Sequence, residues 1–244
     1  MRAITLALGM AALAACSDGT GPGTTGTGQI RLGLSTQSIL AGGPALAASE
    51  SYTLGGTTLM LSRVQLVVRE IELKRVESSS TCGDDSEGES DDDCEEIEFG
   101  PILLDLPLNG SVSQVVTVEA DTGTYGELEF EIHKPEDDSA DAAFLAQHPD
   151  FRRVSIRAEG TWNGTPFVFL SDLGVEQELD LVPPLRIEGA GQTDLTLRVD
   201  LRSWFLNSGG TAFINPATAN QGQPAEGLAK ENIKRSFEAF ENDD

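Results

Sequence analysis

The sequence predicts a mainly β protein, an antiparallel β-sandwich with one short internal helix and a C-terminal helix. Apolar and polar residues alternate with period two in several short segments, which is typical of strands with one buried face. Asn-Gly pairs separate some of these segments, and such pairs favour tight hairpin turns. Hydrophobic residues make up 39% of the 244 residues. This content is sufficient for a core and argues against a wholly disordered chain.

The clearest strand runs from residue 125 to residue 134. Its two faces carry different residues, with Leu128, Phe130 and Ile132 on one and Glu127, Glu129, Glu131 and His133 on the other. A helix would spread these polar residues around its circumference, so the pattern predicts a strand.

The other expected strands include residues 30–34, 59–73, 154–162, 166–170 and 195–201. Within residues 59–73 the apolar positions change parity near Arg69-Glu70, which predicts a bulge or a break. Asn163-Gly164 predicts a hairpin between two of the strands, because both positions tolerate positive φ. Asn109-Gly110 is a second, weaker turn signal.

Two helices are expected. Asp138-Ser139 is a candidate N-cap for a short helix through about Gln147, which His148-Pro149 would end;. Residues 227–241 place Ile233, Phe237 and Phe240 on one helical stripe, so we expect a C-terminal helix there;.

The N-terminus has the pattern of an export signal. Arg2 precedes an apolar run that ends at Ala15, and this run is shorter than the roughly 20 residues that a membrane span needs. Leu13-Ala14-Ala15-Cys16 resembles the lipobox of bacterial lipoproteins. The resemblance implies that residues 1–15 are a signal peptide, that Cys16 is lipidated, and that the protein has a stable lipid anchor in the membrane. An ordinary signal peptide followed by a chance cysteine is the alternative.

Ser17 rather than Asp follows the cysteine, which by the same resemblance favours the outer membrane and a periplasmic or surface-facing position in the cell envelope. Residues 16–29 are rich in Gly and Thr and are expected to form a flexible tether. Residues 30–244 are then one domain.

The formal net charge is −24, and ten of the 40 acidic residues lie in one segment without Lys or Arg, residues 82–98, which we call the acidic loop. Cys82 and Cys94 bracket most of its acidic residues. Because export would place them in an oxidising compartment and Cys16 is assigned to lipid, we expect a Cys82–Cys94 disulfide. The chain-entropy model gives such a bridge a stabilisation of about 3 kcal/mol.

Calcium binding is an alternative role for the acidic loop, because Ca²⁺ prefers clustered carboxylate oxygens. Its spacing departs from the known calcium-loop pattern, and a solvated charged loop is the simpler explanation of the composition. The candidate ligands are Asp84, Asp85, Glu87, Glu89, Asp91, Asp92 and Asp93.

Several function classes are disfavoured. The excess of acidic residues argues against nucleic-acid binding, which needs clustered Lys and Arg. The chain has two histidines, His133 and His148, which could meet in space, but no nucleophile motif accompanies them;. We therefore expect no catalytic residues and no enzyme. Aromatic residues such as Trp162 and Trp204 could face a glycan, although core positions are the simpler interpretation.

Three segments resemble a family of bacterial lipoprotein domains of unknown function. They are residues 66–73, residues 103–106, and residues 121–125, where Gly123-Thr124-Tyr125 precedes the alternating strand. The resemblance implies a transthyretin- or immunoglobulin-like sandwich and assigns no catalytic residues.

These observations together predict a lipid-anchored, exported binding or structural module of the cell envelope. A calcium- or transition-metal-binding lipoprotein and a carbohydrate- or cell-wall-binding module are the alternatives. The sequence does not identify the ligand or the partner, whether protein or glycan.

Overall fold

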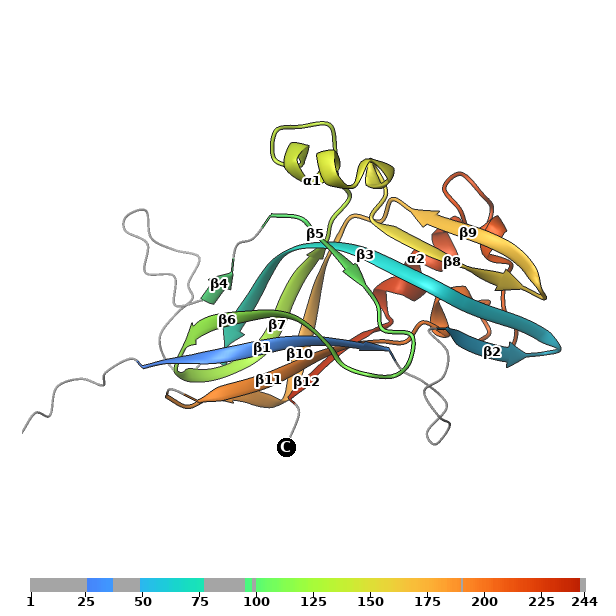
Figure 1. The fold of residues 1–244 in the computed structure, drawn as a ribbon. Coiled ribbons are helices and arrows are strands. Elements are labelled where there is room, and N and C mark those ends of the chain that lie inside the picture. Colours follow the sequence, from blue (N-terminus) through green and yellow to red (C-terminus); the bar gives the residue numbers. More distant parts are fainter. Residues whose placement is uncertain (1–25, 37–48, 77–94, 98–99, 190, 242–244) are drawn as a thin grey trace, which may run out of the picture.

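The computed structural model describes residues 26–36, 49–76, 95–97, 100–189 and 191–241 as two sheets packed around one core (Figure 1). This arrangement confirms the predicted β-sandwich. The smaller sheet has the order β12-β11-β1-β6, and its strands are β1 (Thr27–Thr36), β6 (Ser113–Asp121), β11 (Gln192–Val199) and β12 (Phe237–Glu241).

The larger sheet follows the order β10-β7-β3-β8-β9, with three short strands also paired to β3. Its strands are β2 (Glu50–Leu54), β3 (Thr57–Arg75), β4 (Glu95–Ile97), β5 (Ile102–Asp105), β7 (Gly123–Ile132), β8 (Ile156–Trp162), β9 (Thr165–Ser171) and β10 (Val175–Ile187). The helices are α1 (Ala142–Gln147) and α2 (Glu226–Lys234), with 3₁₀ turns η1 (Pro149–Phe151), η2 (Ser203–Phe205) and η3 (Pro216–Thr218).

The sandwich is not purely antiparallel, because β1 and β11 pair in parallel. Parallel neighbours need a long crossover connection. Here the chain between β1 and β11 includes all the strands of the larger sheet. The other strand pairs among the described residues are antiparallel.

The core is formed by the apolar faces that the alternation predicted. Leu128, Phe130 and Ile132 of β7 are buried in it. Trp204 and Phe205 of η2 are fully buried, and the Phe205 ring packs edge-on against Phe169 with centroids 5.1 Å apart. The expected core role is confirmed for Trp204 and Phe205, whereas Trp162 is partly buried and packs against the edge of the core.

The predicted irregularity near Arg69-Glu70 is confirmed as a bulge within a continuous strand. The pairing of β3 with β7 shifts between Arg69 and Ile71, and Glu70 has a positive φ of 51°. The extra residue returns the apolar side chains of Ile71 and Leu73 to the buried face;. The hairpin at Asn163-Gly164 is confirmed too, with φ values of 49° and 81°.

The two helices differ in part from the prediction. Helix α1 ends at Gln147 as expected, but its N-cap residue is Asp141 rather than Asp138 or Ser139. Asp138 accepts a hydrogen bond of 3.0 Å from the backbone N–H of Asp141, three residues on, so it makes the bond of an N-cap to the turn that precedes α1;.

The predicted helix over residues 227–241 is wrong in its second half. Helix α2 ends at Lys234, and residues 237–241 form β12 at the edge of the smaller sheet. Pairing with β11 supplies backbone hydrogen bonds to this segment. Phe237 is buried and packs edge-on against Phe130, with centroids 5.4 Å apart. The residues assigned to a helical stripe thus belong to two different elements.

Several sequence predictions lie outside the described residues. These are the signal peptide, the lipidated Cys16, the Cys82–Cys94 disulfide and the calcium ligands Asp84, Asp85, Glu87, Glu89, Asp91, Asp92 and Asp93. They stay predictions. Within the part of the chain that is described, none of the helices is long and apolar enough to cross a membrane.

Candidate functional site

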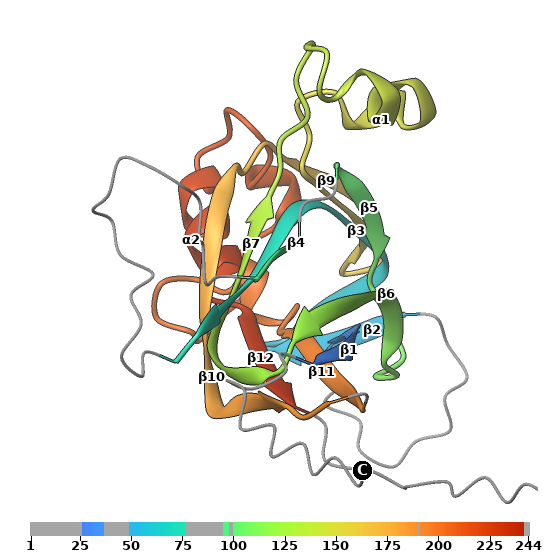
Figure 2. The same cartoon turned by 90° about the vertical axis from the view of Figure 1, so that its left-hand side faces the viewer.

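Residues 133–155, which we call the cap, lie on the outer face of the larger sheet and include α1 and η1. The cap leaves the end of β7 and returns to the start of β8. Figure 2 shows it on the side of the larger sheet that faces away from β1, β11 and β12. A helix of six residues has little stability of its own, so the cap depends on its contacts with the sheet;.

The apolar contact between cap and sheet centres on Val67 of β3. Val67 points away from the main core and is fully buried in a separate cluster with Phe144, Leu145 and Phe151 of the cap. The rings of Phe144 and Phe151 pack edge-on, with centroids 6.5 Å apart. This small core presses α1 and η1 onto the middle of β3.

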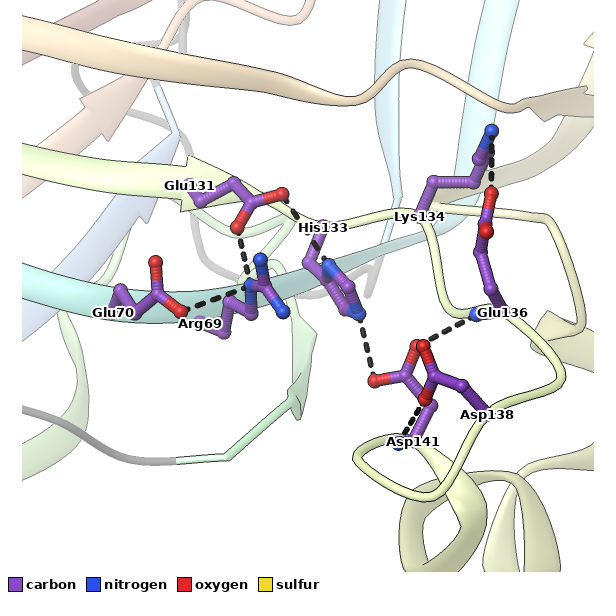
Figure 3. A network of polar contacts seen from close by, with 8 residues as sticks. All are labelled: Arg69, Glu70, Glu131, His133, Lys134, Glu136, Asp138 and Asp141. Atoms are coloured by element: carbon purple, nitrogen blue, oxygen red, sulfur yellow. Dashed lines mark hydrogen bonds and ion pairs between the residues drawn. The ribbon is translucent and has the colours of Figure 1, made fainter.

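A polar network anchors the first half of the cap (Figure 3). His133 Nε2 donates to Asp141 Oδ1 at 2.8 Å, and its Nδ1 lies 3.4 Å from Glu131 Oε1. The other oxygen of Asp141 accepts the backbone N–H of Glu136 at 2.6 Å. His133 and Asp141 are 6% and 1% exposed. This burial leaves them little access to a substrate, so we assign them to holding the cap.

The network continues to the bulge of β3 through Arg69. Its guanidinium contacts Glu131 and lies 3.2 Å from Glu70. Burial lowers the pKa of Arg69, but the hydrogen bond and charge of Glu131 outweigh it and raise the pKa overall. The guanidinium therefore stays charged beside the carboxylate that faces His133.

A cavity of about 210 Å³ lies between the other half of the cap and the sheet. Its sheet side is formed by Arg63 and Gln65 of β3, Arg157 of β8 and Leu103 of β5. The cap side is formed by the residues Gln147, His148, Pro149, Asp150 and Phe151.

Three polar side chains at this cavity have hydrogen-bonding groups that no other described residue uses. Gln65 is 2% exposed, yet its side-chain amide has no hydrogen-bond partner among the described residues. Arg157 donates through Nε to Glu159 at 2.7 Å, and Arg63 donates through Nε to Asp105 at 3.4 Å. Within the described chain, the terminal nitrogens of both guanidinium groups make no hydrogen bond.

The two histidines do not share a site. His133 belongs to the anchoring network, whereas His148 lines the cavity with its ring centroid 4.9 Å from that of Phe144. The sequence singled out both, but not Arg63, Gln65 or Arg157. Polar residues on the outer face of a strand carry no sign that a distant segment covers them.

The described residues contain no group of three or more His, Cys, Asp or Glu side chains placed to hold a metal ion. The calcium prediction concerns ligands between Asp84 and Asp93, which lie outside these residues, and is not tested.

A second buried polar cluster lies at the ends of β1 and β2. The hydroxyl groups of Thr36 and Tyr52 donate to the carboxylate of Glu50, which is 6% exposed. Burial raises the pKa of Glu50 and outweighs these two hydrogen bonds, which lower it. The carboxylate thus joins the two strands at a cost that depends on pH.

Neither the family models nor the curated proteins contain a match to the sequence. Among solved structures, MbnP from Methylosinus trichosporium is similar, with 13% sequence identity and a TM-score of 0.40, over 90% of this chain and 100% of that chain. A similarity this low supports no functional argument. The resemblance to lipoprotein domains of unknown function therefore stays a prediction, consistent with a β-rich fold.

The anchoring role of Asp141 predicts a large loss of stability on its removal. Asp141→Ala leaves His133 and the Glu136 N–H without their buried acceptor, and should lower the free energy of unfolding by about 3 kcal/mol. Asp137→Ala in the same segment removes an exposed ion pair with Arg152 and should cost less than about 1 kcal/mol. Urea denaturation of both variants measures the difference, and equal losses would contradict this role.

The Glu50 cluster predicts a pH dependence of stability. Because the folded-state pKa is raised, the contribution of Glu50 is fully present below its ordinary pKa of about 4.3. It is lost as the pH rises through the raised value. Glu50→Gln cannot ionise, so its unfolding free energy relative to wild type should increase from about pH 4 to about pH 8. Denaturation of both proteins at the two pH values tests this, and a difference in unfolding free energy that stays the same at both would contradict it.

Proposed function

We propose that the chain is a lipid-anchored protein of the bacterial cell envelope that binds a small polar ligand in the cavity beneath the cap. The single observation that carries the binding role is Gln65, whose side-chain amide lines the cavity and has no hydrogen-bond partner among the described residues. The rest of the residue is covered, and the amide is not among the fully buried unpaired atoms, so it reaches the cavity. An amide held in place in this way can donate to a ligand and accept from it without first breaking a hydrogen bond within the protein.

The construction of the cavity supports binding. Ligand sites combine apolar walls with a few polar groups that fix orientation. Here Leu103 and Phe151 contribute apolar surface, and Arg63, Gln65 and Arg157 contribute donors. The two halves of the cap are held by the His133 network and the Val67 cluster, so the cavity exists without a ligand. A preformed site loses little entropy on binding.

We propose binding rather than catalysis for this cavity. Its described lining residues include no Ser, Thr or Cys that could act as a nucleophile;. They provide donors suited to recognition, two guanidinium groups and an amide.

The envelope role is supported by the lipobox-like residues 13–16 and the tether that follows. Cys16→Ala should abolish lipidation, so the chain should move from the membrane fraction to the soluble fraction of cell extracts. Ser17→Ala retains the cysteine and should leave the chain in the membrane fraction. Unchanged membrane association of Cys16→Ala would reject the anchor, and it would leave the cavity proposal to its own test.

Gln65→Leu tests the binding role. Thermal unfolding of the wild type should shift upward with millimolar amounts of at least one small aromatic probe, benzamide or benzoate, and the variant should lose this shift. Without a ligand the free energy of unfolding of the variant should stay within about 1 kcal/mol of the wild-type value, because the substitution removes no hydrogen bond within the described chain;.

The matched control is Gln177→Leu. Gln177 is also buried, but its amide donates to the carbonyl of Glu176 at 3.1 Å and does not line the cavity. This variant should keep the probe-induced shift. A wild type that responds to neither probe, or a Gln65→Leu variant that responds fully, would reject the proposed site.

A further inference from the structure

We infer that the ligand of the cavity beneath the cap is a small carboxylate with an apolar body, held by Arg157 and Arg63 beside Gln65. The inference rests on the proposed binding function and specifies its ligand class.

The pairing of β3 with β8 brings these donors together. Gln65 lies directly opposite Arg157, and Arg63 lies opposite Glu159. Side chains of directly opposed residues in an antiparallel pair project from the same face, with Cβ atoms about 5 Å apart. All three donors therefore stand on the outer face of the larger sheet, where the cavity is.

The guanidinium groups retain the geometry that a carboxylate needs. A guanidinium has about five N–H groups in a planar fork, and the terminal pair matches the two oxygens of a carboxylate. The internal ion pairs of Arg157 and Arg63 run through Nε. In the described chain the terminal nitrogens carry no hydrogen bond, so both forks are available.

The local charge contrasts with that of the whole protein. The chain has a net charge of −24, yet the lining residues include two arginines against the single carboxylate of Asp150. Asp105 and Glu159, which pair with the arginines, have side chains 63% and 31% exposed. Pairs this exposed are weak, so a carboxylate in the cavity competes with them.

The remaining lining favours an organic anion over an inorganic one. Leu103, Pro149 and Phe151 form apolar surface close to the donors. Phosphate would leave this surface uncovered, whereas an aromatic or aliphatic carboxylate covers it. The cavity volume of about 210 Å³ is below the roughly 300 Å³ at which sites for drug-sized ligands begin, which restricts the ligand to a small molecule.

Calorimetric titration of the full chain, purified in detergent, tests the inference with three probes. Benzoate has the carboxylate and the apolar body, benzamide is its neutral counterpart of the same shape, and inorganic phosphate has the charge alone. We expect benzoate to bind at least tenfold more tightly than either of the others. Arg157→Gln should weaken benzoate binding at least tenfold and leave benzamide binding within twofold.

Arg186→Gln is the matched control, because Arg186 lies on β10, is 71% exposed and does not line the cavity. It makes the same charge change and should leave benzoate binding within twofold. If Arg157→Gln does not fold, Arg63→Gln tests recognition of the carboxylate instead, because the Arg63 side chain is 52% exposed and its removal should disturb the fold less.

The possible results separate the two proposals. Benzamide binding as tightly as benzoate would overturn the carboxylate inference and keep the binding function. Phosphate binding as tightly as benzoate would replace it with general anion binding. An unchanged benzoate affinity in Arg157→Gln would overturn it as well, and binding of none of the probes would reject both proposals.

Discussion

Strand β3 is the constraint on which the arrangement of the molecule depends. Its 19 residues pair with β2, β4, β5, β7 and β8. Because side chains alternate along a strand, Leu66 points into the sandwich while Gln65 and Val67 point outward. An outward valine on this sheet needs cover, and the cap provides it. The cap also covers Gln65, two residues earlier on the same face, and the Gln65 amide becomes part of the cavity wall.

The bulge at Glu70 gives β3 a second role. It restores the inward direction of the apolar side chains in the last part of the strand. It also places Arg69 against Glu131, which is the carboxylate next to His133. The polar anchor of the cap thus begins at the irregular point of the strand, and its apolar anchor lies two residues earlier, at Val67. One strand therefore determines both attachments of the cap.

Local features of the fold could be predicted from the sequence, whereas pairings between distant segments could not. The alternation at residues 125–134, the bulge near Glu70 and the Asn163-Gly164 hairpin are set by neighbouring residues. The parallel pairing of β1 with β11 and the strand at residues 237–241 depend on partners far along the chain. The spacing of Ile233, Phe237 and Phe240 fits a helix, and it does not reveal that residues 237–241 pair with β11.

The candidate site could not be predicted from the sequence either, because it too depends on contacts between separate segments. His133 continues a polar strand face that one expects to meet solvent. It is buried because the chain of the cap folds back and brings Asp141 against it. Gln65 and Arg157 become neighbours through strand pairing across about ninety residues. The sequence indicates only that Gln65 and Arg157 lie on the outer face of a sheet. The cap covers this face, and the cavity forms between them.

The central claim is that the cap is docked on β3 and so creates the cavity. Native-state hydrogen exchange at the Leu145 and His148 amides, which bond to Asp141 and Phe144 at 2.8 Å within the cap, tests it most directly. A six-residue helix protects these amides only when docked;. We expect protection in the wild type and exchange at least tenfold faster in Val67→Ala, with Ala229 of α2 unchanged. Unprotected amides in the wild type, or protection that survives Val67→Ala, would contradict it.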